Sequence, residues 1–117
     1  MNEGEWTMEF PAAITVCDGA GIILEMNERA CTAFAKDGGA ELIGKNLMDC
    51  HPPQAQEKVA LLLKSGGQLN VYTMEKDGIK KLIYQAPWYE KGEYRGIVEL
   101  SLPIPSEMPH FIRTSSS

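Results

Sequence analysis

The second half of the chain consists of runs of extended-chain residues separated by short turns. Three runs are rich in Val, Ile, Leu and Tyr, which favours β-strands: residues 69–75, 79–88 and 94–104. Lys76-Asp77-Gly78 separates the first two runs, and Glu90-Lys91-Gly92-Glu93 separates the last two. Both connections are typical of hairpins. We therefore expect three consecutive antiparallel strands.

The first half begins with two shorter strand patterns and a helix. Residues 12–17 and 22–26 are β-rich, and Asp18-Gly19-Ala20-Gly21 between them is a strong turn signal because glycine adopts positive φ readily. Asn27 then has a side chain suited to cap a helix over residues 28–36. One face of that helix is apolar, with Ala30, Cys31 and Phe34 at helical spacing.

The centre of the chain predicts a short helical turn followed by the most amphipathic helix. Glu41-Leu42-Ile43-Gly44 has the pattern of one turn closed by glycine, and Leu47 and Met48 are expected to point inward. Pro52-Pro53 suits the start of a helix over residues 54–65, because proline at the first helical position gives up no hydrogen bond. The apolar stripe of this helix contains Ala55, Val59, Leu62 and Leu63.

The two ends of the chain differ from the central domain, which we place at residues 12–104. Residues 1–11 form a helical cap, in which Trp6 and Phe10 share one face and are the predicted dimer interface. That face could also pack on its own domain, and the sequence does not choose. In the Pro-containing tail, residues 105–117, we expect part of the apolar segment to pack down and the last serines to be disordered.

Composition and charge limit the classes of function. The 117 residues suffice for one domain, and 44% hydrophobic with 23% charged residues is typical of a globular protein. A net charge of -5 argues against nucleic acid and anionic membranes as partners. Apolar runs are too short for a membrane span, and the acidic N-terminus is unlike a secretory signal. A cytoplasmic location is the default expectation.

The chemistry-bearing residues predict neither a metal site nor catalysis. Three cysteines without an export signal indicate reduced thiols, and none is part of a Cys-x-x-Cys pair. The chain has no Gly-rich phosphate loop, no nucleophile-elbow serine set and no His-x-x-x-His pair. We therefore name no catalytic or metal-binding residue and expect no enzyme.

Three local motifs, in their order and spacing, resemble a PAS domain over residues 12–104. The segment from Asp18 to Asn27 is similar to the first hairpin of the family, which ends on an asparagine that caps the next helix. Glu41-Leu42-Ile43-Gly44-Lys45-Asn46-Leu47, with His51-Pro52 after it, resembles the family's central segment. Tyr94-Arg95-Gly96-Ile97-Val98 resembles its closing strand.

The resemblance implies an α+β fold, with a five-stranded antiparallel sheet in the order 2-1-5-4-3 and short helices over one face. It also implies a cavity between the helices and the sheet, where some members hold haem, flavin or small metabolites, while many members only mediate dimerisation. One segment departs from the family. Pro103-Ile104-Pro105 stands where members have an Asp-Ile-Thr triplet that leads into a signalling helix. Output through a continuous helix is therefore not expected.

Large and polar side chains on the sheet and the central segment are the candidates to line this cavity. The predicted ligand pocket consists of Asn46, Met48, Cys50, His51, Tyr72, Tyr84, Gln85 and Trp88. The competing interpretation is that these residues only fill a core. Lys64, Lys80 and Lys81 are interpreted as a solvated face.

Two cofactors have specific sequence requirements. A blue-light flavin adduct needs a cysteine where this chain has Leu47, so that chemistry is not expected. Haem needs an axial ligand, which His51 or Cys50 could supply. The alternative for His51 is a hydrogen bond to nearby backbone that fixes the loop before Pro52.

The sequence leaves three hypotheses. The first is a PAS sensory domain that binds a small molecule or a signalling partner protein and works as a homodimer. The second is a PAS fold with a filled core that serves only protein interaction. The third is a haem- or flavin-binding sensor. The first predicts a cavity larger than a few water molecules.

Overall fold

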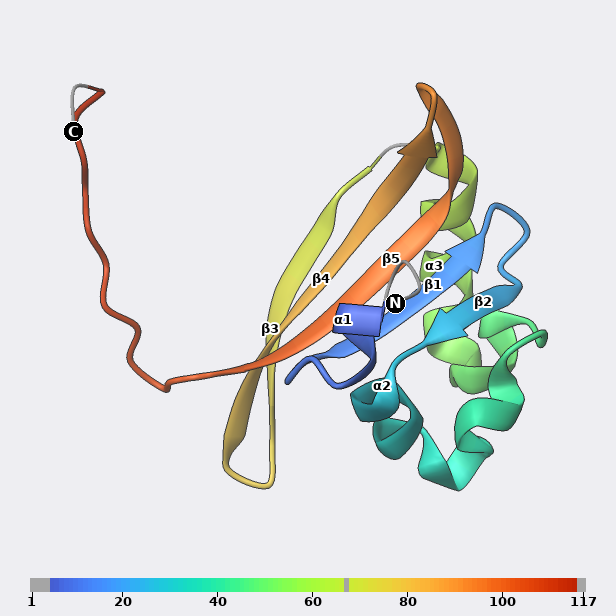
Figure 1. The fold of residues 1–117 in the computed structure, drawn as a ribbon, viewed down its shortest axis with the longest axis horizontal. Helices are drawn as coiled ribbons and strands as arrows, with labels where there is room; N and C mark the ends of the chain where they lie inside the picture. The colour runs from blue at the N-terminus through green and yellow to red at the C-terminus, as the bar shows by residue number, and fades with distance from the viewer. Residues whose placement is uncertain (1–4, 67, 116–117) are drawn as a thin grey trace.

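The computed structural model describes residues 5–66 and 68–115, and their fold is α+β (Figure 1). The strands are β1 (Ala13–Asp18), β2 (Ile23–Met26), β3 (Asn70–Lys76), β4 (Ile79–Glu90) and β5 (Glu93–Ile104). The α-helices are α1 (Glu5–Met8), α2 (Glu28–Ala33) and α3 (Pro53–Ser65). Three 3₁₀ turns lie between α2 and α3: η1 (Ala35–Asp37), η2 (Gly39–Leu42) and η3 (Leu47–Cys50).

The strands form one antiparallel sheet in the order β2-β1-β5-β4-β3, as predicted. The predicted turns are what produce this order. Asp77 and Gly78 adopt φ of 53° and 78° between β3 and β4, and Lys91 and Gly92 adopt φ of 53° and 81° between β4 and β5. Such two-residue turns with positive φ match the twist of the strands they join. β1 then pairs with β5, so that the last strand, β5, lies in the middle of the sheet.

Asn27 connects three elements near the N-terminus and is itself buried. Its side-chain oxygen accepts hydrogen bonds from the backbone N–H of Ala30 at 3.0 Å and of Ile14 at 2.9 Å. Its amide group donates to the carbonyls of Thr7 at 2.9 Å and Ala12 at 2.7 Å. The predicted cap of α2 is confirmed, and the same side chain also fixes α1, β1 and the segment between them.

The hydrophobic core lies under α2 rather than at the centre of the sheet. A buried cluster of Ile23, Met26, Ala30 and Leu42 joins β2, α2 and η2. Partly buried residues complete it, namely Ala13, Cys31, Phe34 and Leu47. The predicted apolar face of the helix after Asn27 is therefore confirmed.

α3 begins and ends as the sequence predicts. Pro53 is its first residue, and Gly66 ends it in the left-handed conformation at φ 67°. The helix packs on the sheet through Val59, which is buried, and the Tyr94 hydroxyl donates to the carbonyl of Leu63 at 2.9 Å. Figure 1 places α3 behind the sheet and α1 in front of it. We call the side that faces α3 the inner face and the opposite side the outer face.

The inner face of the sheet is not purely apolar: buried Cys17, Ile83 and Ile97 share it with polar side chains. On β5, Glu99 and Ser101 have the inner register, because Glu99 pairs with Thr15 and lines the space beneath α3 with it. Alternation along the strand then sends Leu100 and Leu102 to the outer face. On β1, Ile14 likewise faces outward. The outer face is therefore strongly apolar.

A backbone irregularity joins β1, β4 and β5 at one edge of the inner space. The pairing of β4 with β5 shifts between Trp88 and Tyr89. Nearby, a Cβ atom on Gly96 would collide with the carbonyl oxygen of Cys17 and would lie 2.7 Å from the Cα of Asp18. The Trp88 indole donates to that same carbonyl at 2.9 Å. Only glycine permits this approach of the two strands.

The terminal segments depart in part from expectation. α1 ends at Met8, so Phe10 lies beyond it, but the Trp6 and Phe10 rings meet edge to face with centroids 5.8 Å apart. Residues 105–115 contain no helix or strand and run away from the body (Figure 1). Phe111 and Ile112 are 73% and 90% exposed, so in this structure the apolar part of the tail does not pack down. The tail beyond Ser115 lies outside the described residues.

No helix among the described residues is long and apolar enough to cross a membrane.

A candidate ligand cavity beneath α3

A row of polar side chains crosses the inner face of the sheet. Thr15, Glu99, Gln85 and Asn70 are direct cross-strand neighbours on β1, β5, β4 and β3. The Asn70 amide donates to Gln85 Oε1 at 2.7 Å, and the Gln85 amide donates to Glu99 Oε2 at 2.6 Å. These bonds orient the Glu99 carboxylate on a surface that is otherwise covered by apolar residues of α3. We call these four residues the polar row.

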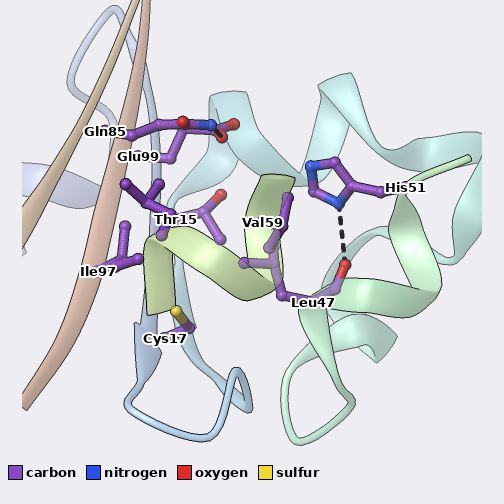
Figure 2. A pocket seen from close by; sticks show the side chains of 9 residues that line it. Thr15, Cys17, Leu47, His51, Val59, Gln85, Ile97 and Glu99 are labelled. Atoms are coloured by element: carbon purple, nitrogen blue, oxygen red, sulfur yellow. Dashed lines mark hydrogen bonds between the residues drawn. The ribbon is translucent and has the colours of Figure 1, made fainter. Parts of the chain in front are cut away.

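The polar row borders two adjoining cavities beneath α3. The inner one has a volume of about 10 Å³ and the outer one about 70 Å³. Both are lined by His51, Val59, Leu62 and Gln85. Figure 2 shows the sheet residues on one side of the inner cavity, with Leu47 and His51 on the other. Since one water molecule needs roughly 10–15 Å³ of such volume, only the outer cavity has room for more than one.

His51 is held in a defined orientation at the far wall. Its Nδ1 lies 3.0 Å from the carbonyl oxygen of Leu47, which can only accept, so Nδ1 carries the proton (Figure 2). The other ring nitrogen, Nε2, is then an acceptor in the neutral imidazole. The Gln56 amide donates to the carbonyl of His51 at 3.1 Å and secures the same loop. The predicted bond from His51 to nearby backbone is confirmed.

Burial and the Glu99 carboxylate both raise pKa values around the inner cavity, while Lys58 places a cation at the outer one. Burial raises the pKa of the Cys17 thiol, a hydrogen bond from Ile97 partly offsets this, and the negative charges of Asp18 and Glu99 raise it further. Burial, and then Glu99, also raises the pKa of Tyr72. Within residues 5–66 and 68–115, no cation forms an ion pair with Glu99. A ligand donor could therefore interact with this carboxylate.

The predicted pocket residues divide into two groups. Three of them line the cavities: His51, Tyr72 and Gln85. Four others lie elsewhere: Asn46, Met48, Tyr84 and Trp88. The side chain of Cys50 lies outside the described residues.

Each of those four has a different place in the fold. Asn46 caps η3 by accepting from the N–H of Met48 at 2.9 Å, and Met48 itself is half-buried in that turn. Tyr84 alternates with Ile83 and Gln85 and so points to the outer face. The Trp88 indole donates its hydrogen bond to the carbonyl of Cys17, at the irregularity between β4 and β5.

The most informative cavity residues that the sequence interpretation missed are Thr15, Cys17 and Glu99. In the sequence Thr15 stands between Ile14 and Val16, and no motif marks it, Cys17 or Glu99 as a site residue. The register of β4 against β5 would have identified Glu99, because it pairs Glu99 with the predicted pocket residue Gln85.

Metal and haem binding were tested against this geometry. The described residues contain no group of three or more His, Cys, Asp or Glu side chains that could hold a metal ion. His51 presents the tautomer that an axial ligand needs. Cavities of about 10 and 70 Å³ are nevertheless far too small for a haem macrocycle. The residues as arranged do not fit haem.

The fold has clear counterparts among solved structures, although no family model and no curated protein matches the sequence. The PAS domain of Bordetella pertussis BvgS matches at TM-score 0.60 and 19% identity, over 85% of this chain and 81% of that one. The Vibrio cholerae Aer2 receptor, described as a dual PAS-heme oxygen sensor, matches at TM-score 0.55 and 18% identity, over 80% and 95%. VqmA bound to DPO matches at TM-score 0.62 and 12% identity, over 86% and 55%.

These likenesses agree with the five-stranded antiparallel sheet in the order β2-β1-β5-β4-β3 and its short helices. The chain therefore has the fold of a PAS domain, as the sequence resemblance predicted.

Proposed function

We propose that this protein is a sensory module that binds a small molecule beneath α3. The observation that supports the proposal best is the polar row. A half-buried carboxylate without a cationic partner in the described chain contributes little to packing, and it lies among apolar walls. An apolar cavity with a few convergent polar groups is the usual form of a ligand site.

The ligand class follows from the groups that face the cavity. Glu99 lines the inner cavity and accepts hydrogen bonds, as does the Nε2 of His51 in the neutral ring, so a ligand there would present N–H or O–H donors. Lys58 adds one cation to the lining of the outer cavity. Leu47, Val59 and Ile97 suit a flat or short apolar body. We expect a small amine, or a heteroaromatic ring with N–H or O–H groups, and we expect small carboxylates to be rejected by Glu99.

Such a ligand needs more room than the resting cavities offer, and α3 is the wall that can provide it. A strand of the sheet could move only by breaking ladder hydrogen bonds. α3 instead contacts the sheet through side chains such as Val59 and Leu62 and through the bond from Tyr94 to Leu63. An outward shift of α3 therefore costs apolar contact that the ligand restores.

Binding can be measured by native mass spectrometry of the purified protein and by thermal unfolding with a panel of small amines, N–H heteroaromatics and matched carboxylates. We expect donor-bearing compounds to raise Tm, since a ligand at 100 times its Kd stabilises the fold by about 2.7 kcal/mol. Glu99→Gln should weaken binding at least tenfold. Glu75→Gln removes the same charge from an exposed site on β3 and should have no effect.

The opposite result would favour the interaction-only role. It would consist of a native mass equal to that of the bare chain and a Tm that no panel member raises at millimolar concentration.

The apolar outer face favours homodimerisation as a second function. Ile14, Leu100, Tyr84 and Val71 form one cross-strand row that lies next to the polar row but on the other side of the sheet. Tyr84 and Val71 are 37% and 43% exposed. The helix α1 lies on the same side of the sheet in Figure 1, and its residue Trp6 is 69% exposed. Contiguous exposed apolar surface of this kind marks association sites.

Light scattering tests this second function. We expect the wild-type protein to have twice the mass of the chain and Tyr84→Glu to reduce the mass to that of a monomer with unchanged circular dichroism. Leu61→Glu is the matched control, because Leu61 is 63% exposed but lies on α3. A monomeric wild type, or equal dissociation by both variants, would contradict the proposal.

A further inference from the structure

A separate cavity of about 200 Å³ lies on the inner face, between α2 and the part of the sheet where β4 begins and β5 ends. Its lining comes from Ala12, Ala13, Arg29, Thr32, Ala33, Lys81, Ser101 and Pro103. None of these residues lines the cavities beneath α3. Ala13 and Ser101 belong to the cross-strand row next to the polar row and form the side of this cavity that is nearest to it.

Each polar side chain of this lining can donate hydrogen bonds, and two of them are cationic. Arg29 lies on the α2 side and Lys81 on the sheet side, while Thr32 and Ser101 add one hydroxyl on each side. Arginine and lysine can only donate. No acidic residue lines the cavity, and in the described part of the chain the ion pairs involve Arg95 and neither of these two cations.

Two cations without acidic partners are notable in a chain of net charge -5. Arg29 lies on α2, and Lys81 reaches the same cavity because of the alternation of β4. Lys80 and Lys81 are adjacent in sequence, but Lys80 pairs with Glu75 and faces outward, whereas Lys81 faces inward towards α2. The sequence interpretation of both lysines as one solvated face is therefore incomplete.

We propose that this cavity is a second binding site, for a small organic carboxylate or a phosphate. Its volume of about 200 Å³ is almost three times the 70 Å³ of the outer cavity beneath α3, which suits an anion of a few non-hydrogen atoms. Arg29 would bind two oxygens of the anion with its planar guanidinium, and Lys81 would supply the opposing charge. The two sites then have opposite preferences, donors beneath α3 and anions beneath α2.

The experiment is a backbone amide NMR titration of the full chain with succinate, and separately with inorganic phosphate, at constant ionic strength. We expect saturable shifts at Thr32, Ala33 and Ser101 and little change at Gln85 and Glu99. Succinate represents the organic carboxylates and inorganic phosphate represents the phosphates. The probe with the lower Kd shows which of the two classes the site prefers.

Arg29→Gln and Lys81→Gln should each weaken the measured Kd at least tenfold. Lys80→Gln is the matched control, since it removes the same charge one residue away on the other face, and it should leave Kd unchanged within twofold. Shifts that do not saturate, or that sodium chloride reproduces, would overturn the proposal. Equal weakening by Lys80→Gln and Lys81→Gln would also overturn it. The cavity beneath α2 shares no lining residue with the cavities beneath α3. If no anion binds beneath α2, the proposed ligand site beneath α3 is therefore unaffected.

Discussion

Gly96→Ala is expected to destabilise the protein by roughly 3 kcal/mol or more, which corresponds to a fall in Tm on the order of 10 °C. The added methyl group would collide with the carbonyl oxygen of Cys17 and lie 2.7 Å from the Cα of Asp18. Both obstacles are backbone atoms of β1, so no side-chain rotation relieves them. Relief requires β1 and β5 to separate at the centre of the sheet. Thermal and urea unfolding measure the change.

Gly78→Ala is the control for this prediction. Gly78 has φ 78° and open space where a Cβ would stand, so alanine there costs only the strain of left-handed backbone, about 1–2 kcal/mol. The steric interpretation of Gly96 fails if the two variants are destabilised equally.

Asn27→Asp is expected to destabilise the protein nearly as much as Asn27→Ala, on the order of 3 kcal/mol each. An isolated helix cap would not distinguish Asn from Asp, because both side chains accept from the helix N-terminus. Here the buried amide group also donates to the carbonyls of Thr7 and Ala12, at 2.9 and 2.7 Å. Aspartate cannot donate to them and would place a negative charge against two carbonyl oxygens.

Asn46→Asp provides the comparison in the same chain. Asn46 also caps a helical turn, because its side-chain oxygen accepts from the N–H of Met48. The hydrogen bond that its amide group donates to the carbonyl of Ala20 is exposed and 3.4 Å long. We expect a loss below about 1 kcal/mol. Urea unfolding of the three variants checks the order. Tolerance of aspartate at position 27 would show that the amide donors contribute little.

The fold could be predicted because its determinants are local. The turn residues of both hairpins, the Asn27 cap and Pro53 at the start of α3 each act over a few residues, and together they leave few alternatives for the strand order. Helix length was predicted less well. The helix after Asn27 was expected to reach residue 36, but α2 ends at Ala33 and continues as a 3₁₀ turn.

The candidate site could be predicted only in part because it depends on which face of each strand is inside. Tyr84 was expected in the pocket because it is large and lies between apolar residues, yet its register sends it outward. Glu99 was overlooked because a charged residue between Val98 and Leu100 suggests exposure. Only the pairing with Gln85 and Thr15 places it inside. The cationic cavity has the same origin, since Lys81 and Arg29 are far apart in sequence.

The alternation of β5 also determines how far a signal has to travel. Glu99 reaches the cavity beneath α3, and Leu100, the next residue, belongs to the apolar row on the opposite side. The two residues are neighbours in one strand that stays paired in the sheet, so a small displacement of the sheet as a whole moves both by a similar amount. If both proposed functions hold, the residue that contacts the ligand, Glu99, and a residue of the dimer interface, Leu100, are joined by a single peptide bond. The sheet itself would then transmit the signal from one face to the other, without a separate connecting element.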